Sequence, residues 1–348
     1  MTPLTSERIK EQARTVGFDL CGVASVEAFP ELSFLHEWLG RGYAGDMTWL
    51  AESAELRSDV RRVLPGARSV IVTGTLYNSD RPYSLALPPG AGHVSRYAWG
   101  DDYHRVLWTR HNELLEWMRQ VSPEPFESSA LVDSGPVQER VYAQYAGLGW
   151  IGKNTCLINP EIGSWLFLGE IITTLPLAPD AEGLEQCGSC TKCLDACPSG
   201  ALVEPGVLDA TRCLSYLTIE HRGAIPVELR QAVGTHIYGC DICQEVCPYN
   251  RPAPQSDDPA WQPRTPFTMP SLVALWQASD ADLHRAIMGG SMRRAKLVGL
   301  RRNLAVAIGN SGAAHALAAL DGGSPDRASV ADPMVQEHVA WARGRGVS

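Results

Sequence analysis

The sequence predicts a chain of three parts: an α/β region, a short cysteine-rich segment and an all-helical C-terminal module. In the first half, two stretches rich in β-branched residues, 67–77 and 165–175, alternate with stretches of helical periodicity. Eight of the ten cysteines lie between residues 185 and 250. From Ser271 onward the sequence is rich in alanine and leucine and is interrupted by glycines. We therefore expect parts at about 1–180, 181–255 and 256–348.

The secondary structure of the first part is predicted from periodicity and from residues that break or cap helices. Residues 78–100 contain three prolines and should form a loop. A helix is expected after Pro136, because proline is favourable at the first helical position, and it should end near Gly147. The other expected elements are helices over 4–16, 31–53 and 101–121, the last capped by Asp101, and strands over 19–25, 67–77, 129–132 and 165–175.

The C-terminal part is predicted from a linker and a helical pattern. Residues 251–268 contain five prolines and little periodicity, which is typical of a linker. Beyond it, short helical stretches separated by glycines suggest a small helical-repeat module of the HEAT-like kind. A plain helical cap explains the same pattern equally well.

Composition limits the classes of protein that this chain can be. Hydrophobic residues make up 45% of it and charged residues 20%, which suits a folded core better than a disordered chain. The net charge of −9 argues against coating nucleic acid or an anionic membrane with the whole surface, although a local basic patch is compatible with it. No apolar run approaches the roughly 18–20 residues that cross a bilayer, and the N-terminus does not resemble an export signal. We therefore expect a cytoplasmic protein without membrane segments.

The cysteines carry the most specific signal. One run has the spacing C-x2-C-x2-C-x3-C and a second has C-x2-C-x3-C, and each is followed by a proline. This is the pattern of bacterial two-cluster ferredoxins, in which the last cysteine of a run ligates the other cluster. Cys213, which lies 27 positions before Cys240, is the candidate for the eighth ligand. The predicted ligand sets are Cys187, Cys190, Cys193 and Cys247 for one 4Fe-4S cluster, and Cys197, Cys213, Cys240 and Cys243 for the other.

Structural zinc sites are the competing interpretation of these thiolates. A cysteine run that ends in Cys-Pro and occurs twice is more typical of cubane clusters. Cys21 and Cys156 lie outside the pattern and are expected to be buried, unreactive thiols. Two clusters in series can conduct electrons to an acceptor, which must be a cofactor, a substrate or a partner protein. The rest of the chain is much longer than a ferredoxin needs, so we expect either an enzyme or a large electron-transfer partner.

Four further stretches carry a resemblance to a known family: LPGARSVI at 64–71, SRYAWGDDYH at 95–104, VDSGPVQER at 132–140 and GLGWIGKNT at 147–155. Together with the cysteine runs they closely resemble epoxyqueuosine reductase over about residues 5–255. The C-terminal helices match the helical-repeat domain of that family only loosely, and Cys156 stands where the family favours an apolar residue. The resemblance implies an α/β cobalamin-binding domain of the nitroreductase or corrinoid-reductase kind and two 4Fe-4S clusters. The implied reaction is reduction of epoxyqueuosine to queuosine at the wobble position of tRNA.

The resemblance also implies site residues. It places a general acid at Asp133, which would protonate the epoxide oxygen as the ring opens. Burial against the corrin would raise the pKa of that carboxyl group. Taken alone, the stretch from Asp133 to Pro136 is more simply a turn or a helix cap. Arg140 is expected either beside Asp133 or in an ion pair with an acid such as Glu139. The candidates for holding cobalamin are Arg57, Tyr97, Asp133, Lys153, Asn154 and Ser164, with Ser215 and Asp241 between cobalamin and the second cluster.

A basic run in the C-terminal part is the candidate surface for tRNA, because lysine and arginine neutralise backbone phosphates. Residues 283–320 contain no acidic residue. A solvated helix face is the alternative explanation of this run. We further expect an external electron donor and a monomeric protein. The residues chosen for tRNA are Arg293, Arg294, Lys296, Arg301 and Arg302.

Two other functions fit the same signals. A reductive dehalogenase-like enzyme would use cobalamin and iron–sulfur clusters on a small molecule. Such enzymes are typically exported with a twin-arginine leader, which the N-terminus does not resemble, and they need no basic patch. A non-catalytic electron carrier would bind the clusters and no cobalamin.

Overall fold

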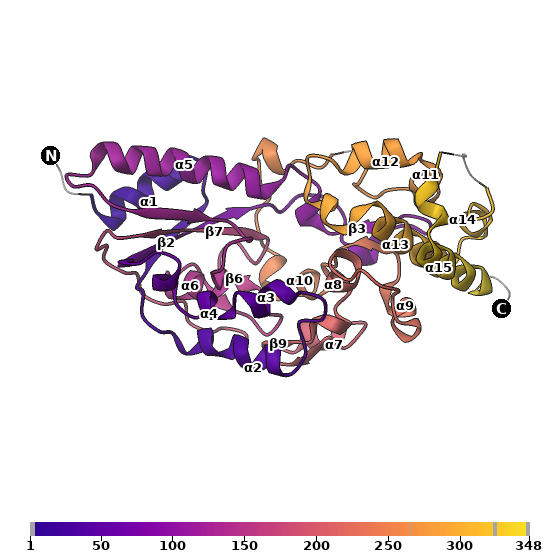
Figure 1. Cartoon of the computed structure of the whole chain (residues 1–348), viewed down its shortest axis with the longest axis horizontal. Coiled ribbons are helices and arrows are strands. Elements are labelled where there is room, and N and C mark those ends of the chain that lie inside the picture. Colours follow the sequence, from indigo (N-terminus) through magenta and orange to yellow (C-terminus); the bar gives the residue numbers. More distant parts are fainter. Residues whose placement is uncertain (1–3, 265, 323–325, 346–348) are drawn as a thin grey trace.

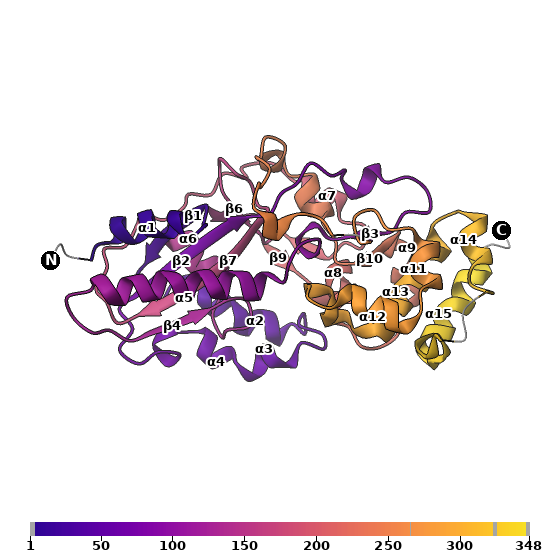
Figure 2. The same cartoon turned by 90° about the horizontal axis from the view of Figure 1, so that it is seen from above.

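The computed structural model describes residues 4–264, 266–322 and 326–345. The molecule is elongated, with a sheet near the N-terminus, the helical module at the other end and the cysteine-rich segment between and beside them (Figures 1 and 2). No helix in the described ranges is long and apolar enough to span a membrane.

The four predicted strands form one antiparallel sheet in the order β1-β2-β7-β4. Every residue of β2 is buried, because the strand is central and covered on both faces. Ile71 packs into the core beneath two helices, while its neighbours Val70 and Val72 face the opposite core, as the two-residue period of a strand requires. The strands are β1 (Leu20–Ala24), β2 (Ser69–Leu76), β4 (Ser128–Leu131) and β7 (Leu166–Thr173).

Helices cover both faces of this sheet (Figure 1). Helices α1 (Ser6–Thr15) and α5 (Tyr103–Val121) share one core with it, and α6 (Glu139–Tyr145) shares the other. Asp102, not the predicted Asp101, caps α5, since its carboxylate accepts a hydrogen bond from the backbone N–H of His104 at 3.1 Å. Asp101 forms an ion pair with Arg264 instead.

The predicted helix over 31–53 is wrong as a single element. The chain instead forms α2 (Phe34–Gly40), α3 (Thr48–Glu52) and α4 (Ala54–Arg57). Gly42 and Gly45 adopt left-handed backbone conformations, with φ of 75° and 55°, and these end the first helix. Beyond α6, the short strands β5 (Trp150–Ile151) and β6 (Leu157–Ile158) form a hairpin whose loop carries residues 152–156.

The cysteine-rich segment contains short elements. Helix α7 (Lys192–Ala196) lies within the first cysteine run and packs against α10 (Ile242–Glu245), which lies within the second. Strand β10 pairs in parallel with β3 (His93–Val94), which comes from the predicted loop over 78–100. The elements are α7 (Lys192–Ala196), β8 (Leu202–Glu204), β9 (Val207–Leu208), α8 (Leu214–Ile219), α9 (Val227–Val233), β10 (His236–Tyr238) and α10 (Ile242–Glu245).

The C-terminal helices surround α13, which is buried from Leu300 to Gly309. Their core also contains Val94, Trp99 and Ile237 from earlier in the chain, so the predicted boundary at 255/256 does not separate two hydrophobic cores. The helices are α11 (Leu272–Gln277), α12 (Asp280–Ile287), α13 (Lys296–Asn310), α14 (Ala314–Ala318) and α15 (Pro333–Gly344). Short 3-10 helices are η1 (Pro30–Ser33), η2 (Val60–Arg62), η3 (Ser84–Ala86), η4 (Arg96–Ala98), η5 (Ala210–Arg212), η6 (Pro248–Asn250), η7 (Pro259–Trp261), η8 (Ser291–Ala295) and η9 (Ala328–Ala331).

Candidate active site

The structure brings the predicted thiols together in two groups. Cys187, Cys190, Cys193 and Cys247 line one cavity, which also contacts Tyr249. The indole N–H of Trp150 donates a hydrogen bond to the thiol of Cys187 at 3.4 Å. The last cysteine of the second run therefore lies with the first three of the first run, as the exchange pattern requires.

The second group consists of Cys197, Cys213, Cys240 and Cys243. The thiol of Cys240 lies close enough to those of Cys197 and Cys213 to interact with them electrostatically, and Cys243 interacts with Cys240 and Cys213 in the same way. The backbone N–H of residue 201 donates to the sulfur of Cys197 at 3.2 Å. The donor set in both groups is four thiols, which suits a 4Fe-4S cluster.

Cys156, which was expected to be an isolated thiol, lies beside the second group. Its thiol is within hydrogen-bonding range of Cys243. It sits at the end of the β5–β6 loop, directly after Thr155, which holds a left-handed backbone with φ of 66°. A β-branched residue in that conformation is strained, and such strain is concentrated at functional sites.

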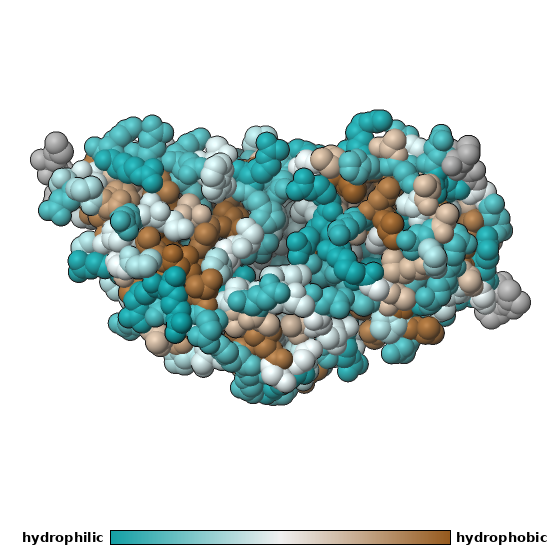
Figure 3. All heavy atoms as spheres, viewed as in Figure 1, coloured by the Kyte–Doolittle hydropathy of each residue, from teal (hydrophilic) through white to brown (hydrophobic). Residues whose placement is uncertain are grey.

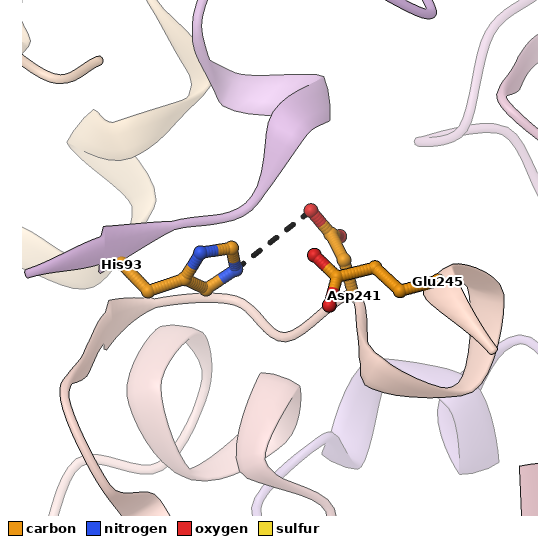
Figure 4. Close-up of side chains that lie close together, drawn as sticks. All are labelled: His93, Asp241 and Glu245. Atoms are coloured by element: carbon orange, nitrogen blue, oxygen red, sulfur yellow. Dashed lines mark ion pairs between the residues drawn. The ribbon is translucent and has the colours of Figure 1, made fainter. Parts of the chain in front are cut away.

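Asp241, predicted to lie between the second cluster and cobalamin, is committed to the protein interior. Its side chain is 2% exposed and accepts hydrogen bonds from the hydroxyl of Ser95 and the backbone N–H of Arg96. Figure 4 shows the imidazole of His93 pointing toward the carboxylates of Asp241 and Glu245. Asp241 therefore holds the 95–96 segment against the cluster-binding loop and does not face open space.

Three other predicted cobalamin contacts also have protein partners. Lys153 donates to two backbone carbonyls of the first cysteine run, and Asn154 donates to one of the second at 3.3 Å. Ser164 is buried and exchanges hydrogen bonds with Asn250 at 2.7 and 2.9 Å. In this structure these side chains organise the cluster-binding loops, and their contact with cobalamin stays a prediction.

A hollow lies between the sheet and the helical module, near the middle of the face shown in Figure 3. Asp133 lies on the loop that follows β4, and its side chain is 57% exposed. Arg294 of η8, in the helical module, is close enough to lower its pKa, so this carboxylate lies on the side of the sheet that faces the module. The residue has a left-handed backbone with φ of 56°, and its N–H donates to the carboxylate of Glu139. The hydrogen bond to Glu139, at the start of α6, therefore holds Asp133 in this left-handed conformation.

Two residues at the start of α5 hold the Asp133 carboxylate. The hydroxyl of Tyr103 donates to Oδ2 at 2.8 Å, and Nε2 of His104 lies 3.1 Å from the same oxygen. The other ring nitrogen of His104 lies 2.7 Å from Oδ1 of Asp102. The sequence analysis assigned no role to Asp102 or His104. Their position at the start of a predicted helix, inside the stretch 95–104 that resembles the family, is the signal that could have identified them.

The pKa of Asp133 is shifted downward in this structure, whereas the predicted rise depends on burial against a corrin. Burial raises it, as expected, but the hydrogen bonds from His104 and Tyr103 outweigh burial and leave the pKa of Asp133 below its ordinary value. Burial lowers the pKa of His104, yet its hydrogen bonds to Asp102 and Asp133 raise it overall to about 9. At neutral pH the carboxylate is therefore ionised and the imidazole protonated.

Arg140 connects the Asp133 loop to the second thiol group. Its guanidinium donates to the backbone carbonyl of Thr155, next to Cys156. It is also close enough to Glu139 to lower the pKa of that carboxyl, although burial and the charge of Asp133 raise it overall to about 7. Arg140 therefore bridges between the two sites that sequence analysis considered separately.

The basic run divides into exposed and buried residues. Arg293, Arg294 and Lys296 are exposed, and Arg294 is close enough to Asp133 to lower its pKa. Arg301 and Arg302 are 0% and 1% exposed, so the prediction that they bind tRNA is wrong. Their guanidinium groups instead donate to backbone carbonyls inside the protein, those of Leu275, Trp276 and Ala278 for Arg301, and of Leu217, His221 and Gly223 for Arg302.

Comparison with known proteins gives this site its context. Residues 186–250 match the family described as a 4Fe-4S double cluster binding domain, and residues 57–134 match "Epoxyqueuosine reductase QueG, DUF1730". The epoxyqueuosine reductase of Xanthomonas campestris pv. campestris is 41% identical to this chain over 96% of its length and 94% of the relative. The chain belongs to the epoxyqueuosine reductase family. The enzyme of Escherichia coli K12 is 38% identical over 97% of this chain and 88% of its own.

Solved structures of epoxyqueuosine reductase share the fold. One that contains an epoxyqueuosine-modified tRNA-Tyr stem loop superposes with a TM-score of 0.84 at 31% identity, covering 97% of this chain and 89% of the other. The Bacillus subtilis enzyme, solved with its catalytic aspartate loop swung out of the active site, superposes with a TM-score of 0.84 at 30% identity over the same shares. Family membership makes this chain an oxidoreductase and favours the predicted reaction over both alternatives.

Proposed function

We propose that this protein reduces the epoxide of epoxyqueuosine in tRNA to the alkene of queuosine, with cobalamin in the hollow and two 4Fe-4S clusters supplying electrons. The observation that carries the proposal is the place of Asp133. Its exposed carboxylate lies near Arg294 of the helical module. Arg140, which follows the Asp133 loop, contacts Thr155 next to Cys156, and Cys156 lies beside Cys243 of the second thiol group.

The electron path is proposed from the two thiol groups. Cys187, Cys190, Cys193 and Cys247 would hold the outer cluster, and Cys197, Cys213, Cys240 and Cys243 the inner one. An external donor would reduce the outer cluster. Cys156 and Arg140 connect the inner group to the Asp133 loop, so this cluster lies on the side of the hollow.

The residues at the hollow fit a corrinoid. Arg57 and Tyr97 both lie near Asp133, and Ser215 follows Cys213 of the inner group. Their guanidinium and hydroxyl groups are suitable partners for corrin amides, and they would hold the ring. Bound cobalamin would supply a redox-active cobalt, a chemistry that side chains lack.

Asp133 would deliver protons. Loss of the epoxide oxygen as water takes two electrons and two protons and leaves a carbon–carbon double bond. Negative charge develops on the oxygen as its bond to carbon breaks, and a carboxylic acid beside it typically accelerates such a step roughly 10²–10⁴-fold.

The helical module would bind tRNA, with Arg293, Arg294 and Lys296 meeting its phosphates. Whether its helices form true HEAT-like repeats does not affect this role. We propose that the enzyme acts as a monomer in the cytoplasm, where its tRNA substrate is.

Substitution of Asp133 tests the proposed function. Asp133→Asn keeps the size of the side chain and removes the transferable proton, so turnover on a modified stem loop should fall by roughly 10² or more. Iron and corrinoid content should not change. Ser134→Ala, in the same loop, is the control and should retain the parent rate. Turnover of Asp133→Asn at the parent rate would overturn the acid role, and loss of cobalamin would make Asp133 a cofactor ligand instead.

A further inference from the structure

Asp102, His104 and Asp133 form a continuous hydrogen-bonded row at the edge of the hollow. Asp102 Oδ1 lies 2.7 Å from one nitrogen of the His104 ring, and Asp133 Oδ2 lies 3.1 Å from the other. Asp102 also caps α5 through the backbone N–H of His104, which fixes the ring at the helix start. The side chain of His104 is 36% exposed, so one edge of the imidazole reaches solvent.

The groups around this row include both cations and acids. His104 has a carboxylate on each nitrogen, and the ring of Tyr103 stacks on it with centroids 4.0 Å apart. The remaining groups act on the two carboxylates rather than on the imidazole. Arg293 acts on Asp102, and the groups near Asp133 are Arg57, Tyr97, Tyr103, Glu139, Glu170 and Arg294.

The resting position of the proton differs from what a general acid requires. Hydrogen bonds raise the pKa of His104 to about 9 against the opposing effect of burial, and leave that of Asp133 below its ordinary value. Between these two values the proton resides on the imidazole, while the oxygen of Asp133 that faces it carries none. Asp133 can act as an acid in this range only after it takes up a proton, and the imidazolium of His104 is the proton donor that lies against it.

We propose that His104, oriented by Asp102, is the residue that protonates Asp133 and thereby supplies the proton that Asp133 passes to the departing substrate oxygen. This inference rests on the proposed function. The Nε2–H bond of His104 breaks as an O–H bond forms on Asp133 Oδ2. That O–H bond breaks in turn as the substrate oxygen takes the proton. Water then protonates Nε2 of neutral His104, whose ring is partly exposed, and a second cycle supplies the second proton. The proton on Nδ1 stays on that nitrogen throughout, hydrogen-bonded to Asp102.

The test is a pH profile of single-turnover rates with pre-reduced holoenzyme and saturating modified stem loop. The parent rate should be flat near neutrality and fall as the pH rises past about 9, because His104 loses its proton there. His104→Gln can still hydrogen-bond to Asp133 but cannot supply a proton. Its rate should be at least about tenfold lower at pH 7.5, and it should recover toward acid pH by up to about tenfold per unit, as solvent protonates Asp133 directly.

Asp102→Asn provides a second, independent readout. Asparagine caps a helix as well as aspartate does, so α5 should remain intact. The imidazolium loses one of its two carboxylate partners, so the alkaline fall in rate should move to lower pH. This variant decides the question if His104→Gln fails to fold or to hold its cofactors.

The possible outcomes are distinguishable. An unchanged rate and profile in His104→Gln would overturn the inference, and so would a loss of rate that does not recover at acid pH, since that would show His104 only positions Asp133. If Asp133→Asn is inactive while His104→Gln behaves as the parent, the proposed function stands and only this inference fails. If Asp133→Asn is fully active, the proposed acid itself is wrong.

Discussion

Glu170 is the least expected residue near the site. It lies on β7 in the middle of the sheet, 0% exposed, and its two oxygens have no donor among the described residues. The group it faces is the carboxyl of Glu139, and two carboxyls can pair only if one is protonated. Burial, and then the charge of Glu139, raise the pKa of Glu170 well above its ordinary value. Glu170 therefore stays protonated at neutral pH and pairs with Glu139, close to the ionised Asp133.

This pair should make stability depend on pH. A carboxyl whose folded pKa is raised binds more protons folded than unfolded, so its stabilisation is greatest below the unfolded value of about 4.3 and is lost as the pH rises toward the folded value. In Glu170→Gln the neutral amide donates to ionised Glu139 without binding a proton. Its melting temperature should exceed that of the parent by a few degrees at pH 8, with little difference at pH 5.

The control for this prediction is Glu116→Gln, on the exposed face of α5. It should follow the parent at both pH values. A melting temperature of Glu170→Gln below that of the parent at pH 8 would contradict the prediction. It would mean that an ionised Glu170 stabilises the folded protein.

The sequence indicates which residues are candidates for the site, but it does not show which groups surround each of them in the fold. Asp133 follows a strand, as predicted, but the direction of its pKa shift in this structure depends on His104 and Tyr103, about 30 positions earlier in the chain. Ser164 and Asp241 have the residue types of cofactor contacts, and only the fold shows that protein groups already occupy their hydrogen bonds.

At the scale of elements, strands were predicted well because their signal is local. The β-branched stretches became β2 and β7, and the four strands lie within two residues of their predicted ends. Helix ends were predicted less well, as with 31–53, because the glycines that break it do so through a left-handed backbone that sequence does not show. The basic run failed for a related reason: it spans η8 and a helix that is buried on nearly all sides, and charge alone does not reveal burial.

The exposed half of that run should bind tRNA. Replacing Arg293, Arg294 and Lys296 together by glutamine should weaken binding of a modified stem loop about tenfold or more at low salt. It should also reduce the slope of log affinity against log salt, because binding with fewer phosphate contacts releases fewer counterions from the RNA. Filter binding over a range of salt measures both, with iron content as the check on folding. An unchanged salt slope would place the docking surface elsewhere.

The buried half should stabilise the fold instead. Arg302 donates to three backbone carbonyls, at 2.5 to 2.8 Å, and Arg302→Met would leave these without a donor. We expect a loss of about 3 kcal/mol or more in unfolding free energy, since removing one partner leaves buried acceptors unpaired. Arg293→Met, at an exposed position, is the matched control and should change stability by less than about 0.5 kcal/mol. Thermal melts that rank the two variants the other way would contradict the burial of Arg302.

At the scale of the whole molecule, the two cysteine runs tie distant segments together. Residues 187–197 and 240–247 are separated by α8, α9 and β10, yet α7 packs on α10 and each run lends its last thiol to the other group. Segment 93–99 joins the same region through β3 and the helical core. The predicted three-part division therefore describes the order of the chain better than its packing. The exchange of the last thiol between the two groups could be predicted from the cysteine spacing, because ligand geometry is a local property of short loops.

Paired cysteine substitutions test this crossing. If Cys187 and Cys247 ligate the same cluster, the double variant Cys187→Ala/Cys247→Ala loses one cluster and should retain about four irons per chain after anaerobic reconstitution, against about eight in the parent. Cys187→Ala/Cys197→Ala removes the same number of thiols from a single run but affects both clusters, so it should retain almost no iron. Iron analysis and electron paramagnetic resonance of the reduced proteins measure the difference. Without crossing the two results would be exchanged, because Cys187 and Cys197 would then share one cluster while Cys187 and Cys247 belonged to two. The two variants carry the same chemical change, so a general loss of stability cannot reproduce the predicted order.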